Sequence, residues 1–198
     1  MDKIELLREI EDSEREVIYE EIAAEYGSGV VDALKQYLSI FNDKYYYWLA
    51  NLYDPGLYDE NGNALGGGFY YSSSARNNDG FGVDLESTWQ ALSWVINDSG
   101  MFSSAEEAKS VLPESMLNEL AAFALSCQSS TDGYFYHPQW GTNIQTSRKG
   151  RDLGYGAQIL AYCGVLPYWN TPNGDKGYYG NPDGDDSKKK PFMIPDFA

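Results

Sequence analysis

Two aspartates, Asp84 and Asp152, have the residue type and the setting to carry out a reaction. Each comes directly before a segment with helical spacing, "LESTWQALSWV" and "LGYGAQILAYC". Glycoside hydrolysis needs two carboxyl groups about 5 to 9.5 Å apart, one acting as acid and the other as nucleophile or base. Aspartate is also a preferred N-cap residue, because it accepts backbone N–H groups at the start of a helix. A catalytic pair and two helix caps both fit this pattern.

A second candidate group surrounds the single histidine of the chain, in "DGYFYHPQW". A lyase that acts on a uronate needs a base to remove the α-proton and a cation to neutralise the carboxylate. His137 or Tyr136 would be the base, and Arg148 and Arg151 would be the cations. A single histidine is more often a hydrogen-bonded structural residue, so both interpretations stay open.

Aromatic residues are abundant, with 17 Tyr, 8 Phe and 5 Trp. Tyrosine and tryptophan either fill a core, with the polar end hydrogen-bonded, or stack on a ligand such as a sugar ring. Several of them lie in the loops around the two aspartates, together with an arginine and a glutamine. We expect these loop residues to contribute to substrate binding: Tyr70, Tyr71, Arg76, Tyr134, Gln139 and Trp140.

The two aspartates belong to an internal repeat. The matching positions are Asp84, Leu85, Gln90 and Leu92 in the first copy and Asp152, Leu153, Gln158 and Leu160 in the second. An aromatic pair precedes each aspartate, Phe69-Tyr70 and Phe135-Tyr136, and a helix-like segment precedes each pair. One such unit cannot bury its apolar face alone, so we expect the two copies, offset by about 68 residues, to stack.

Two stretches of the repeat carry a family resemblance. The stretch "FALSCQSSTDGYFYH" resembles the Q-x-x-D-G-x-[FYW] repeats of the terpenoid cyclase and protein prenyltransferase superfamily. The stretch "GGGFYYSSSAR…DLESTWQAL" is similar to the first repeats of large bacterial proteins classed with α/α-toroid enzymes. The resemblance covers roughly residues 30 to 165.

This resemblance implies an all-α fold, an incomplete α/α toroid of helical hairpins with short β-like aromatic loops. Such toroids also include polysaccharide lyases and six-hairpin glycoside hydrolases. In those hydrolases, aspartates related by the repeat serve as catalytic carboxylates at the ends of inner helices. The resemblance does not fix a chemistry, because function depends on the site rather than on the fold.

Hydrophobic periodicity predicts the elements that position these residues. We expect helices over residues 3–26, 30–53, 85–97, 104–111, 113–126 and 153–163, a short strand at "FYY", and a loop over 128–151. Residues 1–166 would form one helical-repeat domain. Residues 167–198, rich in Pro, Gly and Asp, would be a tail or linker. We expect the chain to be the N-terminal part of a longer toroid protein.

Composition narrows the classes of partner. The net charge is −16 and the pI is about 4.2, which disfavours nucleic acid, anionic membranes and polyanionic polysaccharides. Cys127 and Cys163 lie in apolar helical contexts, and we expect neither a metal site nor a cofactor. The N-terminal segment is charged throughout and unlike a signal peptide, and no apolar run is long enough for a transmembrane helix. We therefore expect a cytoplasmic protein.

These observations favour a carbohydrate-active domain, a glycoside hydrolase or polysaccharide lyase, that acts on or binds a neutral or short oligosaccharide. Asp84 and Asp152 would be the acid and the base. The alternative is a non-catalytic helical-repeat module that binds a glycan or a protein. A third hypothesis is an isoprenoid cyclase or prenyltransferase, since "DGDD" at 183–186 matches the D-x-D-D motif of class II terpenoid cyclases. Its loop-like setting favours a solvated turn instead.

Overall fold

The structure is a computed structural model that describes residues 3–40, 42–93, 102 and 104–182. The chain is mostly helical, with 52% helix against 5% strand. It divides into two compact units. Unit 1 consists of Met1–Asn51 and Ala91–Leu112, and unit 2 consists of Leu52–Gln90 and Pro113–Ala198.

Unit 1 begins with two helices that pack against each other, α1 (Lys3–Tyr26) and α2 (Ser28–Leu38). Lys35 of α2 forms an ion pair with Glu16 of α1 at 2.9 Å. The Lys35 ammonium also lies 4.8 Å from the ring centroid of Tyr19. The predicted helix over residues 3–26 is confirmed by α1.

The predicted helix over residues 30–53 is wrong in its extent, because two helices occupy this region. The first is α2, which ends at Leu38, and the second is α3 (Asp43–Ala50). Asn42 separates them as the N-cap of α3, since its side chain accepts the backbone N–H of Lys44 at 3.0 Å. Hydrophobic spacing continues across this break, so the periodicity alone did not reveal the cap.

The remaining helix of unit 1 among the described residues is α6 (Ala105–Val111). Its N-cap is Ser104, whose hydroxyl accepts the backbone N–H of Glu107 at 3.1 Å. The predicted helix over 104–111 is confirmed.

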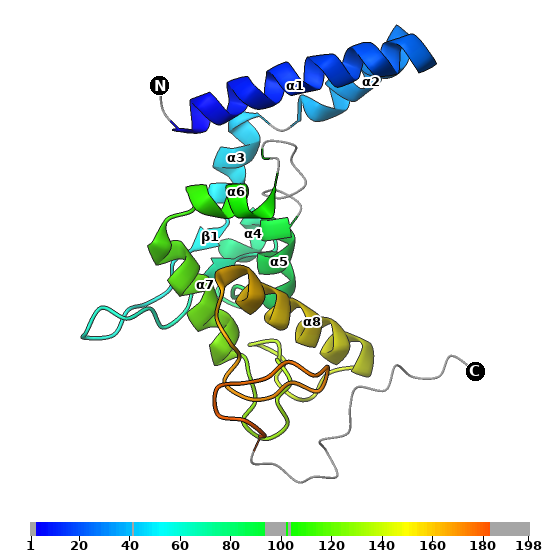
Figure 1. Cartoon of the computed structure of the whole chain (residues 1–198). Coiled ribbons are helices and arrows are strands. Elements are labelled where there is room, and N and C mark those ends of the chain that lie inside the picture. Colours follow the sequence, from blue (N-terminus) through cyan, green and yellow to red (C-terminus); the bar gives the residue numbers. More distant parts are fainter. Residues whose placement is uncertain (1–2, 41, 94–101, 103, 183–198) are drawn as a thin grey trace. The chain divides into compact units, whose positions relative to one another are not determined.

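Unit 2 holds two short strands and four helices in the described part of the chain. They are β1 (Tyr53–Asp54), β2 (Gly68–Phe69), α4 (Ser73–Arg76), α5 (Leu85–Gln90), α7 (Glu114–Ser126) and α8 (Thr146–Cys163). Helix α8 packs against both α5 and α7 (Figure 1). Leu85, Leu120, Phe135, Ile159 and Leu160 are buried in the core of this unit.

The first copy of the predicted repeat is built around β1 and β2. The two strands pair antiparallel, with Tyr53 opposite Phe69. The Tyr70 N–H donates to the carbonyl of Leu52 at 3.0 Å. The side chain of Phe69 is buried, so the aromatic pair supplies one core residue and one residue that continues the loop.

The second copy repeats this geometry after α7. Phe135 forms an antiparallel bridge with Gln128. The Tyr136 N–H donates to the carbonyl of Cys127 at 2.9 Å, which matches the bond made by the tyrosine of the first copy. Phe135 is fully buried. The predicted repeat is therefore confirmed as a repeat of local structure, with a helix, an aromatic hairpin and a second helix in each copy. The hairpin loop is longer in the first copy, where it spans residues 55–67.

The helix ends of unit 2 differ from the predictions in two places. Helix α7 has Pro113 as its N-cap rather than as its first helical residue. Helix α8 begins at Thr146, so the prediction of a loop is wrong over residues 146–151. This first part of α8 is rich in basic residues and contains a glycine, which obscured its helical character. Residues 94–97 of the predicted helix over 85–97 lie outside the described residues.

The first part of the predicted tail is bound to the rest of unit 2. The side chain of Gln128 accepts the backbone N–H of Trp169 at 3.0 Å and donates to the carbonyl of Trp169 at 2.8 Å. The Tyr179 N–H donates to the carbonyl of Tyr168 at 2.7 Å, which closes a hairpin-like loop. Residues 183–198, including the "DGDD" motif, lie outside the described residues.

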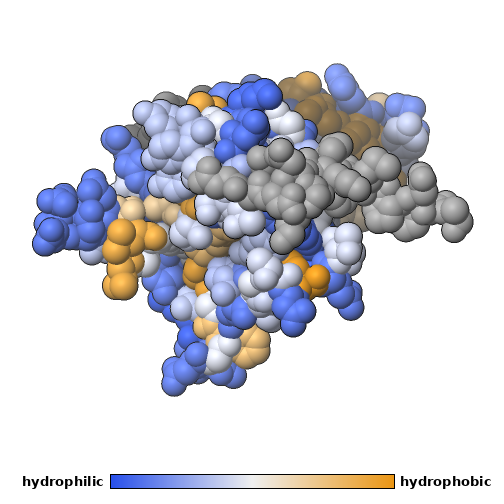
Figure 2. Space-filling model, turned by 90° about the horizontal axis from the view of Figure 1, so that it is seen from below, coloured by the Kyte–Doolittle hydropathy of each residue, from blue (hydrophilic) through white to orange (hydrophobic). Residues whose placement is uncertain are grey.

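The surface seen in Figure 2 is predominantly hydrophilic, and its hydrophobic residues form separate small areas. Large exposed apolar patches are typical of protein or membrane interaction surfaces. Within the described part of the chain, no helix is long and apolar enough to cross a membrane.

Candidate functional site

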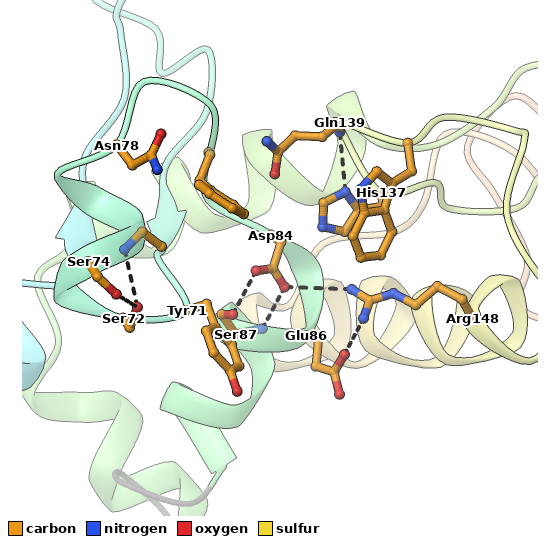
Figure 3. A pocket seen from close by; sticks show the side chains of 14 residues that line it. Tyr71, Ser72, Ser74, Asn78, Asp84, Glu86, Ser87, His137, Gln139 and Arg148 are labelled. Atoms are coloured by element: carbon orange, nitrogen blue, oxygen red, sulfur yellow. Dashed lines mark hydrogen bonds and ion pairs between the residues drawn. The ribbon is translucent and has the colours of Figure 1, made fainter.

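Asp84 stands at the junction between β2 and α5. Its backbone N–H donates to the carbonyl of Phe69 at 3.3 Å, which fixes the start of α5 against the strand. Its carboxylate accepts the Ser87 backbone N–H at 2.8 Å and the Ser87 hydroxyl at 2.7 Å (Figure 3). Asp84 is therefore a helix N-cap, as one of the two sequence interpretations expected. The side chain is buried, yet it borders a cavity.

Arg148 joins the two copies of the repeat. It lies in the first turn of α8, and its guanidinium contacts three carboxylates. Nη2 lies 3.8 Å from Asp84 Oδ1, Nε donates to Asp152 Oδ1 at 3.1 Å, and Nη1 pairs with Glu86 Oε2. Only 14% of the Arg148 side chain is exposed. Both repeat-related aspartates therefore contact one guanidinium, through its Nη2 and Nε atoms.

Asp152 does not precede its helix, and this prediction is wrong. It lies inside α8, one turn after Arg148, and it is fully buried. Its Oδ2 atom has no hydrogen-bond partner among the described residues. Burial raises the pKa of the Asp152 carboxyl to about 6, although the Arg148 guanidinium acts to lower it. The neighbouring carboxylates of Asp84 and Glu86 raise this pKa further.

A cavity of about 470 Å³ opens beside Asp84. It lies between the loops of the two repeat copies, and the Gln139 side chain joins those loops by donating to the carbonyl of Gly80. The residues that line the cavity are Tyr71, Ser72, Ser74, Ala75, Asn78, Phe81, Gly82, Asp84, Glu86, Ser87, His137, Gln139, Trp140 and Arg148.

Three aromatic side chains border the cavity and remain exposed. Tyr71 is 77% exposed, Phe81 is 55% exposed and Trp140 is 54% exposed. One face of the Trp140 ring stacks on His137, with ring centroids 4.0 Å apart. The Arg148 guanidinium lies 5.0 Å from the centroid of the same indole. Trp140 is thus held in place by its neighbours while part of it remains available to a ligand.

His137 is buried and lies on the cavity wall. Burial lowers its pKa, and Arg148 lowers it further, while the carboxylates of Asp84 and Glu86 act in the opposite direction. The imidazole is therefore neutral near pH 7. Nδ1 accepts the Gln139 backbone N–H at 3.2 Å (Figure 3), which assigns the ring proton to Nε2. A histidine in this tautomer offers a hydrogen-bond donor at Nε2 rather than a base.

Tyr136 belongs to a neighbouring cluster and does not line the cavity. Its hydroxyl donates to Asp132 Oδ2 at 2.6 Å, and burial and this bond raise its pKa. The Lys149 ammonium lies 3.3 Å from the same carboxylate and 3.7 Å from the ring centroid of Tyr134. Because the Tyr136 hydroxyl stays protonated and bonded to Asp132, it is poorly suited to act as a base.

The predicted site residues therefore separate into two groups. The structure brings Tyr71, Asp84, His137, Gln139, Trp140 and Arg148 together at the cavity. Arg151 lines a second cavity that adjoins the same tryptophan and arginine. Away from both cavity walls, Tyr70 donates to Asp54 at 3.2 Å, and Arg76 donates to the Tyr53 carbonyl at 2.8 Å.

Sequence reasoning missed two residues that shape the cavity. Glu86 follows Asp84 in the first turn of α5 and pairs with both Arg148 and Arg151. Its position two residues after an aspartate cap, in the first turn of the predicted helix, was the available signal. Phe81, in "DGFGVD", is a large apolar residue flanked by glycines in a loop, which is typical of an exposed aromatic contact.

Two further observations bear on the chemistry. Among the described residues, no group of three or more His, Cys, Asp or Glu side chains is placed to hold a metal ion. Comparison with protein-family models, with curated proteins and with solved structures gives no match to this chain.

Proposed function

We propose that unit 2 is a carbohydrate-binding module that holds a short oligosaccharide in the cavity beside Asp84. The observation that carries this proposal is the combination of exposed Tyr71, Phe81 and Trp140 with buried polar groups on one cavity wall. Ligand pockets typically have such aromatic walls and a few convergent polar groups that fix orientation. Aromatic faces stack on the apolar faces of sugar rings, and the polar groups bind the hydroxyls.

The polar groups match a ligand that is rich in hydroxyls. Neutral His137 offers a donor at Nε2, while Asn78 and Gln139 carry amides that both donate and accept. Asp84 and Glu86 are acceptors, and Arg148 balances part of their charge. A fully charged ligand would meet both signs at short range here, whereas hydroxyls can bond to all of these groups.

The α/α-toroid architecture is part of this proposal. Its support is that α5 and α8, which follow the aromatic hairpins of the two copies, pack against each other in unit 2. In a toroid, equivalent loops meet on one rim, and the cavity lies between two equivalent loops. A ring of further hairpins would continue the same packing.

Hydrolysis is the second candidate function, and one observation favours it. A glycosidase needs one protonated and one ionised carboxyl group, and burial raises the pKa of Asp152 to about 6. Asp84 and Asp152 both contact the Arg148 guanidinium. Against turnover, Asp152 is fully buried, and the Arg148 guanidinium contacts both aspartates. A lyase reaction is less well supported, because His137 carries its proton on Nε2 and Tyr136 is bonded to Asp132.

The test is calorimetric titration of the whole chain with cellotetraose, xylotetraose, maltotetraose and lactose. We expect binding of at least one of them, weakened about tenfold in Trp140→Ala and in Phe81→Ala, because each removes a stacking face. Tyr178→Ala is the matched control, since Tyr178 is 76% exposed and borders neither cavity. Absence of binding to every sugar, or equal losses in all three variants, would contradict the proposal.

The same samples distinguish binding from turnover. Release of new reducing ends that is lost in Asp84→Asn and Asp152→Asn would establish the hydrolase instead of the binding module. Binding of an isoprenoid diphosphate in place of the sugars would support the third hypothesis from the sequence.

A further inference from the structure

A second cavity adjoins the first, and Trp140 and Arg148 line both of them. Its volume is about 330 Å³, and its lining comes from a single stretch of chain at the start of α8. The lining residues are Trp140, Asn143, Ile144, Gln145, Arg148 and Arg151. A ligand that stacks on Trp140 in the first cavity can therefore extend into the second without leaving the surface of unit 2.

The charge of the second cavity is opposite to that of the protein. Its lining includes two arginines and no carboxylate, in a chain with a net charge of −16. The first cavity, in contrast, is lined by Asp84 and Glu86. The polar residues Asn143 and Gln145 add donors to the same lining. Such a set of groups recognises an oxyanion through charge-assisted hydrogen bonds.

The two arginines differ in how far their charges are already balanced. Arg148 contacts three carboxylates and is mostly buried. Arg151 pairs with Glu86 Oε1 through Nη1 at 3.2 Å, and 53% of its side chain is exposed. A guanidinium has five N–H donors, so one carboxylate at Nη1 leaves donors for a second oxyanion. Glu86 contacts both arginines, so Arg151 shares this carboxylate with Arg148.

Basic residues are concentrated at the start of α8. Arg148, Lys149 and Arg151 lie in the first two turns, and the first turn has no acidic residue. The helix dipole disfavours cations at this end of a helix. Carboxylates of other segments balance the charges of two of these cations. Asp84 lies near Arg148, and Asp132 lies near Lys149. Glu86 offsets Arg151 through Nη1, and a bound anion would add a second negative partner to this guanidinium.

We propose that the second cavity binds one anionic group of the oligosaccharide, a carboxylate or a sulfate ester, with Arg151 as its main contact. The proposal rests on the proposed function, because it assigns a neighbouring subsite to the same ligand. The ligand would carry its sugar rings on Trp140 and its hydroxyls toward Asp84, with the anion beyond the indole. A single anionic group is specified because the carboxylates of the first cavity repel a polyanion.

The experiment compares sugars that differ by one charge, by calorimetric titration of the whole chain. Lactose is paired with sialyllactose and with singly sulfated lactose, and xylotetraose is paired with its glucuronate-branched form. We expect one acidic member to bind about tenfold more tightly than its neutral partner, as for one charge-assisted contact. The sialyl and glucuronate arms report on a carboxylate, and the sulfated arm on a sulfate ester.

Variants then locate the contact. Arg151→Gln should reduce the ratio of acidic to neutral affinity to about one, and Arg151→Lys should keep part of it, because the charge remains and the fork is lost. Lys176→Gln is the matched control, since it removes one positive charge from an exposed residue outside both cavities. We expect it to leave the ratio at the wild-type value.

Three outcomes would overturn the inference. Equal binding of neutral and acidic sugars would remove the anion subsite while leaving the proposed function in place. A ratio that falls equally in Arg151→Gln and Lys176→Gln would show a long-range charge effect instead of a contact. Absence of binding to any sugar, neutral or acidic, would remove the proposed function and the subsite together.

Discussion

Arg148 is the residue on which the charges of the site depend. It contacts Asp84, Glu86 and Asp152, and two of these three carboxylates are buried. Removing one partner from a buried ion pair is costly, because it leaves a charge without compensation. The cost is larger than the net contribution of the pair, since desolvation of the remaining carboxylates is no longer offset.

The first prediction follows from this arrangement. Arg148→Met keeps much of the side-chain volume and should lower the free energy of unfolding by about 3 to 5 kcal/mol, measured by urea denaturation. Arg151→Met removes the same charge from the same helix at a half-exposed position and should cost less than about 1 kcal/mol. Asp152→Asn in the Arg148→Met background should recover part of the loss. Equal effects of the two methionine variants would contradict the prediction.

Asp152 gives the second prediction, which concerns pH. Its pKa is raised to about 6 in the folded protein, chiefly by burial, so the folded state holds this proton more tightly than the unfolded state. The contribution of this proton to stability is complete below the unfolded pKa and is lost as the pH rises through 6.

Between pH 5 and pH 7.5, wild type should therefore lose about 1.4 kcal/mol of unfolding free energy relative to Asp152→Asn. The asparagine keeps a carbonyl that can accept the Arg148 Nε–H but does not titrate. Urea denaturation of both proteins across this range measures the difference, and the other carboxyl groups cancel in the comparison. A wild-type advantage that grows with pH would mean that the ion pair with Arg148 outweighs burial.

At the scale of elements, α8 holds the site together, because it contacts α5 and α7 and carries Arg148 toward the cavity. Its packing depends on a close approach between the helix and the aromatic hairpin of the second copy. A Cβ atom at Gly156 would lie 2.4 Å from the Phe135 ring, which is fully buried. The equivalent position in the first copy is Thr88, whose hydroxyl accepts the Phe69 N–H at 3.0 Å. The two copies thus use different contacts to fix the same junction.

The third prediction compares two glycines of α8. Gly156→Ala should lower the free energy of unfolding by about 1 to 3 kcal/mol, because the new methyl group overlaps the Phe135 ring. Gly154→Ala is the matched control, since nothing lies within 4 Å of its added Cβ. It should raise stability by about 0.5 to 1 kcal/mol through helix propensity. We expect the denaturation midpoint to fall in Gly156→Ala and to rise in Gly154→Ala, each relative to wild type. A stabilising Gly156→Ala would disprove the packing argument.

The sequence predicted those parts of the fold that depend on local patterns. The repeat was visible because equivalent residues, such as Asp84 and Asp152, keep one frame in both copies. Helices α1 and α6 were visible through spacing and a serine cap. The start of α8 was not, because basic residues are unfavourable at a helix N-terminus. Carboxylates from other segments contact Arg148, Lys149 and Arg151 here. Local propensity carries no information on such partners.

The candidate site was predictable in its residues and not in its geometry. The sequence indicated that Asp84, His137 and Trp140 belong to equivalent loops, and these residues do line one cavity. It could not show that Arg148 would contact both aspartates, because that depends on how α8 packs on α5. Asp152 was expected directly before a helix, and it lies inside α8 instead, because that helix begins at Thr146.

At the scale of the whole molecule, the site lies within one unit but depends on two stretches of chain. Unit 2 consists of Leu52–Gln90 and Pro113–Ala198. The first stretch supplies Asp84 and Glu86, and the second supplies Arg148 and Arg151. The second cavity, lined by two arginines, is therefore a local exception within a strongly acidic protein. Local ion pairs stabilise the fold, whereas the repulsion between the many negative charges destabilises it.

The last prediction tests the long-range repulsion produced by the net charge. The net charge of −16 produces self-repulsion that is greater in the compact folded state than in the expanded unfolded state. Sodium chloride screens these interactions, since the Debye length falls to about 10 Å at 0.1 M ionic strength. The urea midpoint at pH 7 should therefore rise between about 20 mM and 200 mM salt. Lys176→Glu, which replaces a positive charge with a negative one at an exposed position, should make the rise steeper. A midpoint that falls with salt would show that ion pairs, such as those of Arg148, outweigh the repulsion.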